Sequence, residues 1–346
     1  MHPQKPVSPM TQTFRPTYQQ PKQRLLKHKL RTHRLLNFCQ STALILLLSL
    51  LLGYLALLLA GPIAASIAFL AVIVLYITNP IIAPHFILRM YRAQEISPFD
   101  APELFRLLAV LSENASLPKP PQLYYIPSRV INAFAVGTPA DSALAVSDGV
   151  LKKLNYTELA GVLAHEITHI ANNDIRVMSF ADIASRITKL LSLTGQFLLL
   201  LNLPLILFME IQLNWIPIII LIIAPFISDL IQLGLSRIRE YQADMGSALL
   251  LGDARPLASA LNKMEQYKHN YLGGIFVPIQ KIPEPSLLRT HPATEERIKR
   301  LLEYQQLQTE NHPFNPVFDA DDGEIPTPFR HSTINRPRRY ITGFWY

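Results

Sequence analysis

The longest pattern in the chain is an apolar run from Leu35 to Leu88 that contains no Lys, Arg, Asp or Glu. As one straight helix this run would be about 80 Å long, far more than a bilayer is thick. Gly61 and Pro62 fall near its middle, and both residue types favour a turn. The run therefore predicts two membrane spans, roughly residues 41–60 and 63–82, joined by a tight turn.

A second apolar pair begins at Leu190. The stretches 190–209 and 211–228 carry no charge and are separated by Glu210. Each is long enough to cross a bilayer, although Pro204 and Pro225 are expected to bend them. We expect a second membrane hairpin. A pair of buried helices, or a hairpin that enters the membrane only in part, remains an alternative.

The segment that precedes this second pair has apolar residues at helical spacing and contains His-Glu-x-x-His, from His165 to His169. Asn155 or Thr157 is expected to cap the helix. Residues four apart lie on one face of a helix, so both imidazoles can bind one metal ion. Glu166 points about 100° away and can accept a proton from a metal-held water. The pattern favours zinc-dependent peptide hydrolysis over a helix in which these side chains only form hydrogen bonds.

Glu240 is the candidate third ligand. It shares a helix face with Asp244, which can accept a hydrogen bond from the far nitrogen of a ligand histidine. Two histidines and one carboxylate leave a fourth position for water, as catalytic zinc requires. Taken alone, this segment also fits an ordinary charged helix face paired with Arg237 and Arg239.

Several motifs resemble the HtpX-like membrane metalloproteases, which are relatives of the type I CAAX prenyl proteases. The similarity covers roughly residues 40–301. Its main motifs are A-H-E-I-T-H-I-A-N-N-D at 164–174, S-R-I-R-E-Y-Q-A-D at 236–244, I-N-A-F-A-V-G at 131–137, T-H-P at 290–292 and R-I-K-R-L at 297–301.

The resemblance implies a role for each matching residue. It implies one Zn²⁺ ion as cofactor, with Glu166 as general base. A positive charge or a hydrogen-bond donor at His291 could stabilise the oxyanion of the tetrahedral intermediate, although His291 also fits a structural turn before Pro292. The remaining implied roles are zinc ligation by His165, His169 and Glu240, and orientation of the ligands by Asp244 and Asp174.

A β-hairpin is expected directly before the motif helix. The pattern predicts a helix over 102–114 and strands over 123–126, 130–136 and 143–147, and a turn-rich stretch separates the last two strands. A free sheet edge can hold an extended peptide by backbone hydrogen bonds. By resemblance, the substrate-binding residues Asn132, Ala133 and Phe134 lie on or near that edge. An internal hairpin with Phe134 simply buried is equally compatible with the sequence.

The formal net charge of +7 does not indicate nucleic-acid binding, because the surplus is confined to one end. Residues 1–34 hold eight Lys or Arg and no acid. A basic segment before a first span places the N-terminus in the cytoplasm. Basic residues beside the other spans agree with this orientation, so four spans leave the site cytoplasmic. The single cysteine, Cys39, excludes an internal disulfide.

The expected fold is α+β and mainly α: a multi-span membrane protein with a zincin-like cytoplasmic catalytic domain. The segments 89–189 and 236–305 are expected to form this domain, with membrane hairpins at 38–88 and 190–235. Residues 1–37 are expected to be a disordered basic tail, with 22–36 lying along the membrane, and residues 306–346 a disordered C-terminal tail.

These observations predict an integral-membrane zinc endopeptidase whose partners are protein substrates and the lipid bilayer. By resemblance, it acts in membrane-protein quality control in a bacterial-type inner membrane. The basic N-terminal tail also resembles a mitochondrial presequence in composition. Two other functions stay open: a non-catalytic adaptor that binds unfolded chains, and a specific lipoprotein or prenyl-protein processing protease, which would need more than four spans.

Overall fold

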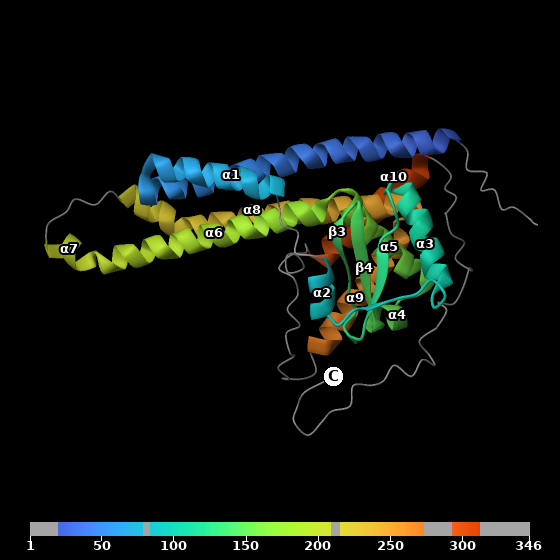
Figure 1. Ribbon diagram of the computed structural model, residues 1–346. Coiled ribbons are helices and arrows are strands. Elements are labelled where there is room, and N and C mark those ends of the chain that lie inside the picture. The colour runs from blue at the N-terminus through green and yellow to red at the C-terminus, as the bar shows by residue number, and fades with distance from the viewer. Residues whose placement is uncertain (1–19, 79–83, 209–214, 273–292, 312–346) are drawn as a thin grey trace, which may run out of the picture.

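The computed structural model describes residues 20–78, 84–208, 215–272 and 293–311. Three long helices form an extended bundle, and one end of this bundle continues into a compact domain that contains a small sheet (Figure 1). The described part of the chain is mainly helical with a mixed four-stranded sheet, which confirms the α+β, mainly α, expectation.

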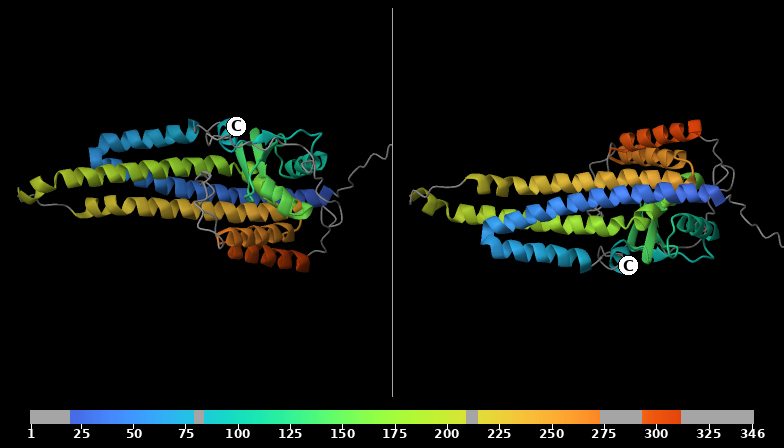
Figure 2. Two further views of the ribbon diagram at one scale, coloured as in Figure 1. Left: turned by 90° about the horizontal axis from the view of Figure 1, so that it is seen from below. Right: turned by 90° about the horizontal axis from the view of Figure 1, so that it is seen from above.

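Helix α1 (Gln20–Thr78) is a hairpin of two helices joined at Gly61, whose backbone has φ 80° and ψ −173°. A positive φ is readily adopted only by glycine, and the following Pro62 suits the start of the returning helix. Figure 2 shows α1 doubling back on itself. The predicted turn is confirmed. The prediction of a disordered tail is wrong for residues 20–37, because the helix begins at Gln20 and continues without interruption into the apolar segment.

The second apolar pair forms helices α6 (Asp174–Leu201), α7 (Leu203–Phe208) and α8 (Trp215–Leu251). Both α6 and α8 extend well beyond the predicted spans and run on into the compact domain. Among the described residues, two stretches contain an 18-residue segment apolar enough to cross a membrane: in 42–72 this segment has a mean hydropathy of 2.7, and in 215–251 it has 2.3. Helix α6 is not one of them, and its first half is charged.

Buried apolar side chains hold the three helices together. Leu48 and Leu52 of α1 pack against Phe180 and Ala184 of α6 and against Ile231 of α8. The outward faces of the same helices expose many large apolar residues, which is typical of lipid contact.

The sheet has the strand order β1-β2-β4-β3, with β2 and β4 parallel and the other neighbours antiparallel. Its strands are β1 (Gln94–Glu95), β2 (Gln122–Ile126), β3 (Ala133–Thr138) and β4 (Asp141–Ser147). The β3–β4 hairpin confirms the predicted one, with Thr138 paired to Asp141 across the turn. Strand β3 is therefore an edge strand. Strand β1 and the parallel pairing were not predicted.

The remaining helices surround the sheet. Helix α3 (Pro102–Asn114) has the predicted bounds, and the others are α2 (Pro84–Met90), α4 (Asp148–Lys153), α5 (Tyr156–Ala171), α9 (Arg255–Leu272) and α10 (Thr294–Asn311). Helices α8 and α9 are separate elements. Helix α8 ends before Gly252, which has φ 74°, and Asp253 then accepts a hydrogen bond from the Arg255 amide at 2.9 Å. Helix α10 also extends past the predicted start of the C-terminal tail.

The main core lies between the sheet, α3 and one face of α5. Its fully buried side chains include Leu107, Leu144, Leu163 and Ile167. This packing fixes the depth and rotation of α5, so the polar side chains on its opposite face are presented toward α8 and β3.

Candidate active site

Helix α5 begins with a complete capping box. The Asn155 side chain accepts a hydrogen bond from the Glu158 amide at 2.8 Å, and the Glu158 carboxylate accepts one from the Asn155 amide at 2.9 Å. Of the two candidate caps, Asn155 is the one observed. The helix ends at Ala171, and Asn173, with φ 57°, reverses the chain before α6 starts at Asp174. This turn brings Asp174 back beside the last turn of α5.

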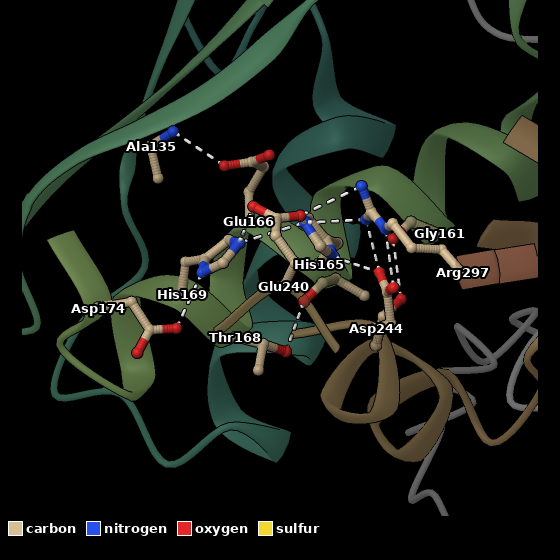
Figure 3. Close-up of polar contacts among 12 residues, drawn as sticks. Ala135, Gly161, His165, Glu166, Thr168, His169, Asp174, Glu240, Asp244 and Arg297 are labelled. Atoms are coloured by element: carbon tan, nitrogen blue, oxygen red, sulfur yellow. Dashed lines mark hydrogen bonds and ion pairs between the residues drawn. The ribbon is translucent and has the colours of Figure 1, made fainter. Parts of the chain in front are cut away.

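His165, His169 and Glu240 converge on one point, although Glu240 comes from α8 (Figure 3). The two Nε2 atoms lie 3.1 Å apart. The Glu240 carboxylate lies 3.5 Å from Nε2 of His165 and 3.7 Å from Nε2 of His169. All three potential ligand atoms are within 4.8 Å of one another. Two imidazoles and one carboxylate at such separations form a donor set suited to zinc.

Each histidine uses its other ring nitrogen to contact an acid. Nδ1 of His165 lies 3.1 Å from Asp244 Oδ1, and Nδ1 of His169 lies 2.8 Å from Asp174 Oδ2. These contacts leave both Nε2 atoms facing Glu240, the arrangement seen for metal-bound histidines. Burial lowers the pKa of His165, but hydrogen bonds with Asp244 and Glu240 outweigh it and raise this pKa to about 9. The carboxylates thus favour positive charge at this point.

Glu166 points away from the ligand cluster and toward the sheet. Its Oε2 accepts a hydrogen bond from the backbone amide of Ala135 at 3.0 Å. Ala135 belongs to the edge strand β3, so the candidate base lies against the outer edge of the sheet (Figure 3).

The three candidate substrate-binding residues lie at the start of this edge strand. Asn132 donates its amide to Ser147 Oγ at 3.0 Å, and Ala133 and Phe134 pair with β4. The Phe134 side chain is only 3% exposed and packs against Tyr91, with 4.9 Å between ring centroids. Both backbone groups of Asn132 are thus used toward β4, since its carbonyl also accepts a hydrogen bond from the Ser147 amide at 3.0 Å, and the Phe134 ring is buried, as an internal hairpin requires.

Arg297 belongs to the candidate site but was not predicted from the sequence. From α10, it contacts both carboxylates of Asp244 and Glu240, with Nη2 at 2.6 Å from Asp244 Oδ1 and Nη1 at 3.1 Å from Glu240 Oε2. Burial lowers the pKa of Arg297, but the adjacent carboxylates raise it further, so the charge persists. Two signals were available: Arg297 opens the motif R-I-K-R-L at 297–301, and it lies one helical turn before Leu301, which is buried.

A second arginine supports the other acid. Arg239 Nη1 lies 2.7 Å from Asp174 Oδ1, and both side chains are buried. The remaining candidate, His291, lies outside the described residues.

Comparison of the sequence with known protein families agrees with the metal-binding arrangement of these side chains. Residues 98–305 match the model of peptidase family M48. The chain belongs to this family, and it is a metalloprotease.

Its relatives include proteins named protease HtpX homolog. The one from Acaryochloris marina is 37% identical over 237 residues, which are 63% of this chain and 78% of that protein. The one from Campylobacter concisus is 35% identical over 263 residues, or 69% of this chain and 87% of that protein. The predicted relationship to the HtpX-like membrane metalloproteases is confirmed.

Among solved structures, Ste24p of S. mikatae is similar at 19% identity with a TM-score of 0.41. The match covers 79% of this chain and 66% of that one, slightly less than two thirds of its length.

Proposed function

We propose that this protein is an integral-membrane zinc endopeptidase that cuts misfolded or membrane-associated proteins at the cytoplasmic face. One observation carries this proposal. The three potential ligands, from two helices far apart in the sequence, lie within 4.8 Å of one another beside a glutamate that contacts an edge strand.

His165, His169 and Glu240 would hold a single Zn²⁺ ion. Bound zinc would polarise the scissile carbonyl and lower the pKa of a water molecule. Asp244 and Asp174 fix the orientation of the two imidazole rings through the 3.1 Å and 2.8 Å contacts to their Nδ1 atoms.

Glu166 is the proposed general base. It accepts the proton of the attacking water and returns this proton to the leaving amine. The Ala135 amide holds one carboxylate oxygen at 3.0 Å, which limits the rotation of the side chain. His291 is the proposed donor to the oxyanion, by resemblance to the family.

Strand β3 is the proposed substrate platform. Its outer edge carries no further strand in the described sheet, and the Ala135 amide points to this edge, so an extended peptide can lie along the segment that begins with Asn132, Ala133 and Phe134. Such pairing places a peptide bond next to Glu166 without requiring a particular side chain. A platform of this kind favours unfolded segments of varied sequence.

The membrane orientation rests on the distribution of basic residues. Four spans with a cytoplasmic N-terminus leave the compact domain in the cytoplasm, because both hairpins return to the same side. We propose the bacterial-type inner membrane and a role in quality control by resemblance to the HtpX-like proteases, whose homologs are among the relatives of this chain.

The proposal is tested with purified full-length protein in detergent and an unfolded reporter. Wild-type protein is expected to bind one zinc ion and cut, and chelation is expected to abolish cutting. Glu166→Gln should retain zinc but lose at least about 100-fold in rate, since one general base supplies roughly 10²–10⁴. Glu103→Gln, an exposed glutamate on α3, is the matched control.

Retention of full activity by Glu166→Gln would contradict the assigned base. Zinc binding without any cutting by the wild-type protein would favour a binding protein over a protease.

A further inference from the structure

Two helices connect the apolar bundle directly to the candidate active site. On α8, large exposed apolar residues occur from Trp215 to Leu230, and none occurs between 231 and 251. On α6 they occur from Ile187 to Leu201, and none occurs between 174 and 186. The apolar outer faces of the two helices therefore end at corresponding positions.

An ion pair marks this end. Lys189 Nζ of α6 lies 2.6 Å from Asp229 Oδ1 of α8, and the two side chains are 44% and 51% exposed. A half-exposed ion pair facing hydrocarbon is costly, so the pair fits the headgroup level at the bilayer surface.

The lengths of the two helices beyond this ion pair give the height of the site above the headgroup level. At 1.5 Å per residue, α8 rises about 16 Å from Asp229 to Glu240. On the same basis, α6 rises about 22 Å between Lys189 and Asp174, the partner of His169. Figure 1 shows both helices running along the bundle axis into the domain, so little of this length is lost to tilt.

The sheet adds a second requirement. Its strands cross the bundle axis instead of following it (Figures 1 and 2). A peptide paired with the edge strand β3 therefore lies roughly parallel to the bilayer surface. An anchored substrate has to leave the membrane, rise to the site and turn before it can pair.

We propose that the height of the site limits which peptide bonds of a membrane-anchored substrate can be cut. A chain anchored in the bilayer is cut only at bonds separated from the membrane by about five to seven extended residues, at roughly 3.3 Å each. This inference rests on the proposed function. A loop anchored at both ends needs twice that length plus the residues that pair with β3. Tight loops of folded membrane proteins are thus out of reach, whereas long unfolded loops and tails are accessible.

The test uses full-length protein in phosphatidylethanolamine and phosphatidylglycerol vesicles with single-span substrates. Each substrate carries an unstructured cytoplasmic tail built from one repeated sequence, so that every position offers the same bonds. Mass spectrometry of the membrane-bound stubs gives the cut sites. We expect the bonds of the first four residues to be cut at least tenfold more slowly than bonds beyond the seventh.

The same tail, released as a soluble peptide, is the matched control and should be cut along its whole length. A substrate with two spans should be cut when its loop has 30 residues and resist when it has eight. Glu166→Gln in the same vesicles should cut none of these substrates.

Equal cutting of bonds adjacent to the membrane and of distal bonds overturns the inference while leaving the proposed function intact. Absence of cutting in the soluble tail overturns the proposed function and the inference together.

Discussion

Arg297 forms a bidentate ion pair with Asp244, with Nη2 at 2.6 Å from Oδ1 and Nε at 2.8 Å from Oδ2. Because Asp244 also contacts His165, this pair links α10 to a candidate ligand on α5 through a residue of α8. Both charged side chains are at most 6% exposed. The guanidinium of Arg297 thus neutralises part of the negative charge of the site's carboxylates.

Arg297→Lys is expected to weaken metal binding. Lysine keeps the charge but cannot form the two parallel hydrogen bonds, so Asp244 is held less firmly. Loss of an outer partner of a ligand typically costs 10–100-fold in metal affinity, roughly the range we expect here. Competition with a zinc-binding dye measures the affinity.

Arg300→Lys is the matched control, since Arg300 lies on the same helix and stacks over Tyr241, 3.8 Å from the ring centroid. Equal zinc affinity in Arg297→Lys and wild-type protein would show that the ion pair does not position the ligand.

Glu158→Gln should lower stability at neutral pH but not in acid. Burial raises the pKa of Glu158, but hydrogen bonds from Lys263, the Asn155 amide and Ser259 outweigh it, so the pKa is lowered from its usual 4.5. A lowered pKa contributes stability above about pH 4.5 that is lost as the pH falls through the folded-state value. At pH 7 we expect a loss of about 1–3 kcal/mol, because hydrogen bonds to the charged group disappear.

Thermal unfolding in detergent at pH 7 and below pH 4.5 measures the difference. The exposed Glu103→Gln provides the control. A gap between Glu158→Gln and wild-type protein that stays constant across this range would contradict the assignment.

Gly161→Ala should destabilise the catalytic domain. A Cβ at this position would lie 2.6 Å from the backbone nitrogen of Leu257, and backbone cannot move aside as a flexible side chain can. We expect a loss of about 1–3 kcal/mol from this overpacking between α5 and α9. Gly234→Ala on α8 is the control, because a Cβ there meets nothing within 4 Å and alanine is the better helix former.

The melting temperatures of the Gly161→Ala and Gly234→Ala variants are compared. If Gly161→Ala melts no lower than Gly234→Ala, the close approach of α5 to α9 is not a constraint.

Ser192 and Pro225 are expected to be energetically coupled within the apolar bundle. Pro225 has no amide hydrogen, so the carbonyl of Leu221, four residues earlier, lacks its usual helical donor. The Ser192 hydroxyl donates to this carbonyl, and Gln196 in turn donates to Ser192 at 3.0 Å. Ser192→Val should cost about 0.6–1.7 kcal/mol, the range for such bonds between membrane helices.

A double-mutant cycle isolates this coupling. In a Pro225→Ala background, the amide of residue 225 can serve Leu221, so Ser192→Val should cost much less. Thr194→Val is the control, since Thr194 is exposed and bonds only within its own helix. Equal costs of Ser192→Val in both backgrounds would refute the coupling.

The parts of the fold that depend on local sequence could be predicted. The turn at Gly61, helix α3 and the β3–β4 hairpin follow from backbone preferences and short-range periodicity. The predicted site residues on α5 and α8 do lie together in the structure, because spacing of four places them on single helix faces. Their chemical roles remain proposals for the experiments above.

The parts that depend on contacts between distant segments were missed or misplaced. The continuity of helix α8 from the apolar segment into the site was not predicted, because its charged half is stabilised by burial against α5 and α10 and not by local pattern. The parallel pairing of β2 with β4 was not predicted, because register between strands is set by what each face packs against. Arg297 was missed because only docking of α10 brings it to Asp244.

The sequence by itself determined which side chains can bind a metal and which segments are apolar enough for a membrane, since both depend on residue type and spacing. Only the tertiary structure decided that Glu166 faces the amide of Ala135 at the sheet edge, and that α6 and α8 hold the site well above their apolar ends. Those relationships come from the packing of separate elements, which residue spacing along one chain does not specify.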